Sequence, residues 1–351
     1  MPGEAARNVL SGTTHALRYA VALGVALAAL ATAEVVGTDA ILSRAAAYRD
    51  SGGSVLTLEA VGQVDGSACD ALGDAPGVRA AGALRAEPEP LIASALPRGP
   101  IAAYAVTGGL LEVLGAERTA EPGVVLSRMA SEGLGVGAGE PLAMTTGSTA
   151  VHGVYDWPDD GRRSGLGYAA LVPTRANDTY DQCWVDAWPA PPNLPTLVRT
   201  VLLRSADGTA PVVVSRLNAS LGATFDGHEL YAARVTRFAV AAGVATGLVV
   251  GLVSVRTRRL ELASARHVGT GAAAQHVQIL LECTTWGLAA VALASGPVAV
   301  AVAAGTGGDR ASLLAGALHV ALPGAVSALL GAQCGVLTTR EDQLFRYFKN
   351  R

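Results

Sequence analysis

Four long apolar runs constrain this chain more than any other feature. They cover residues 16–36, 238–255, 279–304 and 313–337. At a rise of about 1.5 Å per residue, each run is long enough to cross a hydrocarbon layer of about 30 Å as a helix. Half of the 351 residues are hydrophobic, only 16% are charged, and the mean hydropathy is +0.37, a composition too apolar for an ordinary soluble domain. The sequence therefore predicts a multi-pass membrane protein.

Basic residues near the ends of the runs predict its orientation. Two groups mark the cytoplasmic face, one after the second run and one after the fourth: Arg256, Arg258, Arg259 and Arg266, then Arg340, Arg346, Lys349 and Arg351. Between the third and fourth runs, Arg310 is offset by Asp309, which fits the outer face. The chain is thus expected in a bacterial inner or plasma membrane, with both termini on the cytoplasmic side and the long segment between the first two runs on the outer side.

The first run has a second interpretation. Arg7 and Arg18 precede an apolar core that ends in LATAE, so Ala31, Thr32 and Ala33 fit the cleavage site of a signal peptide. The run is longer than the roughly 7 to 15 residues usual for such a core, which favours a retained membrane helix. Either interpretation leaves the long segment outside.

That outer segment mixes strand-like and helix-like pieces, which predicts an α+β domain on helical stalks. Strand-like pieces alternate or are β-branched, at residues 54–61, 149–155 and 211–214. Helix-like pieces lie at 68–72, 107–114 and 226–237, and the last is expected to continue straight into the second membrane run. The acidic turn at Asp156, Asp159 and Asp160 is interpreted as a solvated hairpin, because it lacks the spacing of a calcium loop.

The four cysteines separate by compartment. Cys69 and Cys183 lie in the outer segment, where oxidising conditions allow a disulfide to persist, so we expect a bridge between them. The alternative is two unpaired buried thiols. Cys283 and Cys334 lie near the cytoplasmic ends of their runs.

Catalytic patterns are hard to find. The six histidines do not pair with Cys, Asp or Glu at metal-ligand spacings, and there is no G-x-S-x-G elbow. A P-loop needs a lysine for the β and γ phosphates, and the only lysine is Lys349 near the chain end. We expect no catalytic residues, no bound cofactor or metal, and no nucleic-acid partner. If ATP drives this protein, a separate polypeptide hydrolyses it.

The loop after the second run carries the most specific pattern. Its arginines alone indicate a positive-inside anchor. The order of features goes further, because an Arg-rich helix with an embedded Glu precedes a glycine break and then a glutamate at the start of an apolar helix. This order resembles the cytoplasmic loop of FtsX/MacB-like ABC permeases. The matching residues are Arg259, Glu261, Leu262, Ala263, Arg266, Val268, Gly269 and Glu282, whereas Thr270 and Gly271 depart from the usual pattern.

A second segment supports the resemblance. Residues 122–144 and the following VHGVYDWP are similar to part of the MacB-like extracytoplasmic core domain. The match is carried by Gly123, Leu126, Ser127, Ala130, Leu134, Gly135, Val136, Gly139, Glu140 and Gly153. Each motif alone is moderately specific, but their order along the chain is more so.

The resemblance implies four transmembrane α-helices with a large α+β extracytoplasmic domain between helices 1 and 2. The implied parts are a cytoplasmic N-terminus with helix 1 (1–37), the outer domain with its stalk (38–237), helix 2 (238–255), a coupling loop (256–278), helix 3 (279–304), an outer loop (305–312), helix 4 (313–337) and a cytoplasmic tail (338–351). It also implies a non-catalytic permease subunit, a separate cytoplasmic ATPase that uses ATP, and a second permease subunit in the bilayer.

Within that family the loop docks on the ATPase. The residues that the resemblance assigns to coupling are Arg256, Arg258, Arg259, Glu261, Arg266, Gly269 and Glu282. Arg259 and Arg266 would bind acidic groups on the ATPase, Gly269 would permit the sharp turn, and Glu261 and Glu282 would order the loop. The implied function is export or extraction of a peptide, lipid-linked or antimicrobial compound. The alternatives are mechanotransmission to a cell-wall hydrolase, and a membrane-anchored ligand sensor outside ABC systems.

Small residues repeat every fourth position in two of the runs. They are Gly243, Gly247 and Gly251 in the second run and Gly331 and Gly335 in the fourth. Such stripes let two helices approach closely. We expect a homo- or heterodimer of permease subunits, and the stripe fits packing across the dimer as well as packing within one chain.

Overall fold

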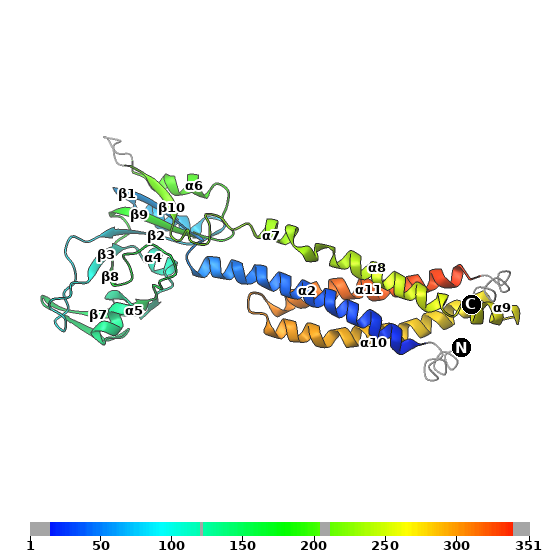
Figure 1. The fold of residues 1–351 in the computed structure, drawn as a ribbon. Helices are drawn as coiled ribbons and strands as arrows, with labels where there is room; N and C mark the ends of the chain where they lie inside the picture. The colour runs from blue at the N-terminus through cyan, green and yellow to red at the C-terminus, as the bar shows by residue number, and fades with distance from the viewer. Residues whose placement is uncertain (1–14, 120–121, 204–210, 340–351) are drawn as a thin grey trace. The chain divides into compact units, whose positions relative to one another are not determined.

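Figure 1 shows the fold in a computed structural model, which describes residues 15–119, 122–203 and 211–339. Arg7 and the basic residues predicted for the cytoplasmic tail, Arg340, Arg346, Lys349 and Arg351, lie outside these ranges. The chain divides into two compact units. Unit 1 contains Met1–Ala45 and Asp226–Arg351, and unit 2 contains Ala46–Phe225.

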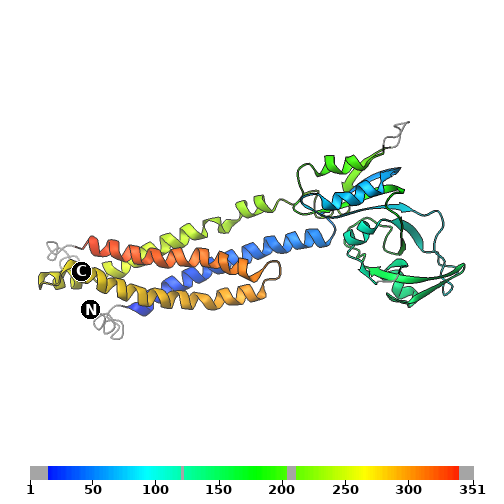
Figure 2. The ribbon, with the colours of Figure 1, turned by 180° about the vertical axis from the view of Figure 1, so that it is seen from behind.

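Unit 1 is built from long apolar helices that lie side by side (Figures 1 and 2). Among the described residues, four are long and apolar enough to cross a membrane: α2 (Ala16–Asp50), α8 (Ala239–Arg256, preceded by the 3-10 turn η3, Val235–Phe238), α10 (Ala272–Ala304) and α11 (Arg310–Leu337). In chain order, α2 precedes unit 2 and the other three follow it. Two short helices, α7 (Gly227–Ala233) and α9 (Arg259–His267), flank α8. The last five residues of α2 belong to unit 2.

The glycine stripe of α8 packs against α11 in the same chain. A Cβ placed on Gly251 would lie 1.9 Å from the carbonyl oxygen of Ala328, and one on Gly247 would lie 2.1 Å from that of Gly324. The contact is reciprocal, because a Cβ on Gly331 would lie 2.1 Å from the carbonyl oxygen of Leu248. Gly335 faces the Val255 side chain and Gly243 faces the Val320 carbonyl at longer distances. The stripe therefore brings two backbones of one chain together, as in the alternative of packing within one chain.

The predicted continuous helix from residue 226 into the second membrane run is wrong. Helix α7 ends at Ala233, and the backbone of Arg234 is extended, with φ −60° and ψ 143°. The guanidinium of Arg234 binds Glu34 of α2, with Nη2 donating to Oε1 at 3.0 Å. No glycine or proline occupies residues 228–238, so the sequence contains no strong sign of the break, whereas the contact with α2 is a tertiary one.

Unit 2 is an α+β domain whose described residues form a sheet of ten strands. The strands are β1 (Val55–Asp65), β2 (Val78–Ala86), β3 (Ala102–Val106), β4 (Glu117–Arg118), β5 (Val124–Ser127), β6 (Pro141–Met144), β7 (Gly147–Tyr155), β8 (Ala169–Pro173), β9 (Thr179–Ala187) and β10 (Val213–Arg216). Their order is β10-β1-β9-β2-β3-β8-β5-β7-β4, with β6 paired to β7. The pairs β3–β8 and β5–β7 are parallel and the others are antiparallel.

Short helices cover this sheet and close its cores. They are α3 (Gly66–Ala71), η1 (Leu72–Asp74), α4 (Gly108–Val113), α5 (Arg128–Leu134), α6 (Leu194–Leu197) and η2 (Val198–Val201). The predicted disulfide is present, and it joins Cys69 of α3 to Cys183 of β9. Both cysteines are fully buried among apolar residues of β1, β9 and η2. The bridge therefore fastens α3 to the centre of the sheet.

The strand-like and helix-like pieces predicted inside unit 2 coincide with β1, β7, β10, α3 and α4. The predicted hairpin at the acidic turn is wrong, because β7 and β8 on either side of it do not pair with each other; β8 lies between β3 and β5. The Asp160 carboxylate in this turn accepts hydrogen bonds from the Arg162 guanidinium, so a protein group binds it in place of water. Alternation along the flanking strands could not reveal that their neighbours in the sheet come from elsewhere in the chain.

Candidate functional site

The loop between α8 and α10 lies at one end of unit 1. Both views of the ribbon place α9 at the end of the bundle where α8 and α11 finish and α10 starts (Figures 1 and 2). Leu262 and Ala263 are buried, and Leu262 packs in the apolar cluster that also contains Ala16 and Val336. Glu261, Ser264 and His267 are exposed. Helix α9 is therefore amphipathic and rests on the bundle through its apolar side.

The carboxyl end of α9 is closed by a turn that requires glycine. The amide of Gly269 donates to the Arg266 carbonyl at 2.9 Å, and the amide of Thr270 donates to the Ala265 carbonyl at 3.0 Å. Gly269 has φ +100°, in the region that side-chain-bearing residues rarely adopt. The turn displays Val268 with 84% of its surface exposed. Gly269 thus has the predicted role of permitting the turn.

Arg258 joins the start of α9 to α10. Its Nη1 donates to Oε2 of Glu282 at 2.7 Å, and its Nη2 and Nε donate to the two carboxylate oxygens of Glu261 at 2.7 and 3.0 Å. Arg258 and Glu282 are both buried, whereas Glu261 is largely exposed. Burial works to lower the pKa of Arg258, but the hydrogen bonds and charges of Glu261 and Glu282 outweigh it and raise the pKa. Arg258 is therefore a charged internal tie, and the two glutamates order the loop through it.

Arg266 fastens the other end of α9 to the last turn of α11. Its Nε donates to Oε1 of Gln275 at 2.6 Å, its Nη2 donates to the Val336 carbonyl at 3.2 Å, and its Nη1 donates to the Thr339 carbonyl. These carbonyls lie at a helix carboxyl terminus, where a cation is favoured. Three of the five N–H donors of Arg266 are thus used within the chain, and its predicted role, binding acidic groups on another protein, stays a prediction.

The remaining arginines of the loop differ in exposure. Arg256 ends α8 and is exposed, and Arg259 is half-buried at the first position of α9. Gln275 was not predicted as a site residue, yet it is buried, and its Nε2 donates to the Leu262 carbonyl at 2.8 Å while its Oε1 binds Arg266. The signal in the sequence was weak, because Gln275 is one of two glutamines near the start of an apolar helix, Gln275 and Gln278.

A second buried ion pair was missed entirely. Glu34 of α2 is 5% exposed and binds Arg234, whose Nη1 also donates to the Tyr231 carbonyl at 2.7 Å. The Arg234 guanidinium lies 3.5 Å from the centre of the Tyr231 ring. Glu34 stands in an apolar run, and an ionisable group in such a run is a candidate functional residue. This pair joins α2 to the break between α7 and α8.

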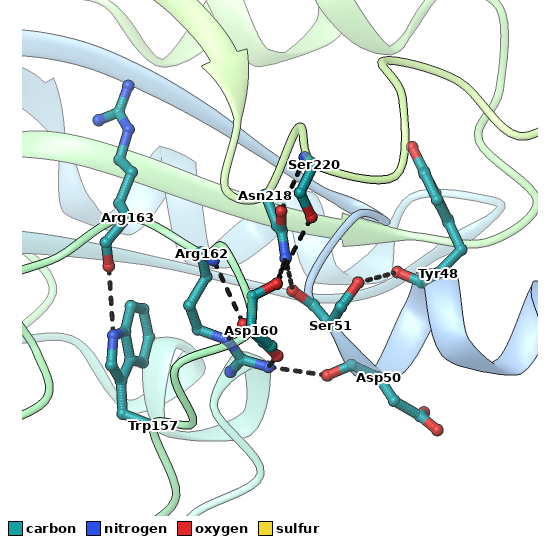
Figure 3. A network of polar contacts seen from close by, with 9 residues as sticks. All are labelled: Tyr48, Asp50, Ser51, Trp157, Asp160, Arg162, Arg163, Asn218 and Ser220. Atoms are coloured by element: carbon teal, nitrogen blue, oxygen red, sulfur yellow. Dashed lines mark hydrogen bonds and ion pairs between the residues drawn. The ribbon is translucent and has the colours of Figure 1, made fainter.

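In unit 2, a polar network holds the end of α2 (Figure 3). Arg162 donates to the Asp50 carbonyl at 2.8 Å and to both carboxylate oxygens of Asp160. The buried amide of Asn218 donates to the carbonyls of Ser51 and Asp160 at 2.9 and 3.0 Å. Burial works to raise the pKa of Asp160, but the hydrogen bonds from Arg162 outweigh it and lower the pKa. The acidic turn is thus a structural lock on the last turn of α2.

The second family-like segment, residues 122–144, forms β5, α5 and β6. Ser127 caps α5 by accepting from the amide of Ala130 at 3.3 Å, and Gly135 ends it with φ +68°. Glu140 accepts from the amide of Gly137 at 2.7 Å. These residues carry local structure. In the described ranges, no group of three His, Cys, Asp or Glu side chains is placed to hold a metal ion.

Comparison with known proteins finds similarity to solved structures, among them three extracytoplasmic or permease domains. The periplasmic region of MacB from Actinobacillus actinomycetemcomitans is 11% identical, with a TM-score of 0.35 over 48% of this chain and 91% of that one. A domain of a permease protein from Porphyromonas gingivalis is 15% identical, with a TM-score of 0.35 over 48% and 92%. The extracellular domain of the ABC-type transporter YknZ from Gram-positive bacteria is 12% identical, with a TM-score of 0.31 over 47% and 100%.

No family model and no curated protein matches the chain.

Proposed function

We propose that this chain is the permease subunit of an FtsX/MacB-type ABC system, and that α9 with its carboxyl-terminal turn is the element on which a separate cytoplasmic ATPase docks. The observation that carries this proposal is the way α9 is held. It is a short amphipathic helix between two apolar helices, tied to α10 through Arg258 and to α11 through Arg266. A loop that served only as a positive-inside anchor has no need of such ties.

The ties give the loop a mechanical role. A force applied to α9 reaches α10 through the Arg258–Glu282 pair and α11 through the bonds of Arg266 to Val336 and Thr339. Helix α8 follows, because its glycines contact the α11 backbone directly. ATP-driven movement of the partner would therefore shift three helices together. In this scheme Arg258, Arg266 and Gln275 position α9, and its exposed residues meet the partner.

Four helices are few for a complete transporter, so we propose that a second permease subunit completes the assembly. Its contact uses a surface other than the α8 glycine stripe, which α11 already covers. The family resemblance favours export or extraction of a peptide, lipid-linked or antimicrobial compound over mechanotransmission, because the outer unit, residues 46–225, is large.

The test is a co-purification in mild detergent with two matched substitutions. Val268→Glu places a charge on the exposed turn after α9, and Val61→Glu does the same to a valine of β1 that is 70% exposed. We expect an ATPase to co-purify with the wild type and with Val61→Glu, and to be depleted from Val268→Glu. Equal ATPase recovery with both variants would refute docking on this turn, and no ATPase with the wild type would refute the permease proposal.

A further inference from the structure

The segment that leads into α8 is unusually exposed. In α7 no residue is buried, and the following turn exposes Val235 at 93% and Phe238 at 61%. A seven-residue helix is marginal in water without tertiary packing. The chain thus presents apolar side chains on a short helix and turn that no other described part of unit 1 covers.

The position of the segment along the chain specifies what covers it. Helix α8 has 18 residues and therefore a length of about 27 Å, which nearly matches a hydrocarbon layer of about 30 Å. Arg256 at its inner end and Arg237 just before its outer end then lie at the two boundaries of that layer. Val235 and Phe238 fall at the outer boundary, where apolar chains and headgroups meet.

The side chains have the chemistry of that boundary. Tyr231 and Phe238 are half- to mostly exposed aromatic residues, and each lies beside an arginine: Arg234 at 3.5 Å from the Tyr231 ring centre and Arg237 at 4.5 Å from that of Phe238. Aromatic rings and arginines with apolar stems are enriched at the headgroup level. Arg234 is engaged by Glu34, whereas Arg237 is exposed, with Nη1 donating to the Ala232 carbonyl at 3.3 Å.

We infer that residues 230–238 form a lipid-binding anchor at the membrane–water boundary, on the outer side of the membrane that α8 crosses. Val235 and Phe238 insert among acyl chains, and the Arg237 guanidinium binds a phospholipid phosphate. The Glu34–Arg234 pair fixes the break between α7 and α8 against α2, so that the exposed side chains of this segment are held at the headgroup level. This lipid contact does not depend on a partner ATPase.

The experiment uses the full chain in vesicles of phosphatidylcholine and phosphatidylglycerol, with Cys283→Ala and Cys334→Ser leaving the disulfide as the remaining cysteine pair. A nitroxide is attached at Val235→Cys, and relaxation by oxygen, which partitions into lipid, is compared with relaxation by a water-soluble nickel chelate. Reference labels are Val249→Cys, an exposed position within α8, and Ser264→Cys on the exposed side of α9. We expect oxygen to dominate at Val235 and Val249 and nickel to dominate at Ser264.

Arg237→Glu tests the phosphate contact, and Arg199→Glu, which alters an exposed arginine of unit 2, is its control. We expect Arg237→Glu to shift the Val235 label toward nickel accessibility and Arg199→Glu to leave it unchanged. Nickel dominance at Val235 in the unaltered background would overturn the inference, as would poor access to both reagents, which would mean that protein covers the segment. An equal response to both charge reversals would overturn the role of Arg237.

Discussion

Gly251→Ala is expected to force α8 and α11 apart. A Cβ at this position would lie 1.9 Å from the Ala328 carbonyl oxygen, 2.8 Å from the carbonyl carbon and 2.9 Å from the Ala332 amide nitrogen. All three atoms are backbone, so no rotamer change removes the clash. Ordinary contact needs about 3.5 Å, so α11 has to retreat by roughly 1.5 Å, and a gap of about 1 Å already forfeits up to half of a dispersion contact.

The expected cost combines two effects of opposite sign. Overpacking of this kind destabilises by about 1–3 kcal/mol, and the severity of the clash places Gly251→Ala near the upper value. Alanine also favours a helix over glycine by about 1 kcal/mol. Gly287→Ala in α10 is the control, because nothing lies within 4 Å of a Cβ there, so it carries only the second effect. The difference in free energy of unfolding between the two variants is therefore expected to be about 3 kcal/mol.

The buried thiol of Cys283 reports the result. It lies in the apolar cluster with Val255, Ala328 and Ala332, so it reacts with a thiol reagent only when these helices open. In a Cys334→Ser background, the extent of labelling is followed across a denaturing detergent titration. Equal midpoints for Gly251→Ala and Gly287→Ala would refute the backbone-to-backbone contact.

Three further predictions follow from the ion pairs and the disulfide. Arg258→Met is expected to lower the free energy of unfolding by about 3–5 kcal/mol in the same titration, because it leaves the buried charge of Glu282 without its partner. The double variant Arg258→Met with Glu282→Met is expected to restore much of that stability. Equal losses in the single and double variants would contradict this explanation. Replacing both Cys69 and Cys183 by alanine opens a loop of 114 residues and is expected to lower the free energy of unfolding of unit 2 by up to about 4–5 kcal/mol, from the chain entropy of that loop. The melting temperature, followed by tryptophan fluorescence, should fall accordingly, and an unchanged melting temperature would be the contrary result. Because the folded-state pKa of Asp160 is lowered, its carboxylate stabilises the fold at pH values above the unfolded-state pKa of about 3.9, and this stabilisation disappears as the pH falls through the folded-state pKa. The melting temperatures of wild type and Asp160→Asn should therefore differ at neutral pH and converge in acid. A difference that stays constant with pH would argue against the lowered pKa.

Several features could be predicted from the sequence because they depend on local composition. An apolar run long enough to span a hydrocarbon layer remains a helix in nearly any arrangement, since its backbone groups bond within the run. The bridge between Cys69 and Cys183 could be expected because only two cysteines lie in the outer segment. Gly269 could be assigned to a turn because few other residues tolerate its backbone conformation.

The role of each arginine could not be predicted in this way. Arg256, Arg258, Arg259 and Arg266 lie within eleven residues and carry the same charge. Only the fold decides that Arg258 meets Glu282 from 24 positions away and that Arg266 meets the end of α11 from 70. A charge pattern along one segment contains no information about which residues of other segments face it.

The sequence by itself thus determined which segments are helices in the membrane, which cysteines pair, and that an arginine-rich loop joins two of the helices. The tertiary structure decided that the α8 glycines face α11, that the helix breaks at Arg234 opposite Glu34, and that two of the loop arginines point inward. The physical reason is that a helix, a turn or a span is stabilised by neighbours along the chain, whereas the partner of a glycine or a buried charge is set by backbones that meet only after the chain has folded.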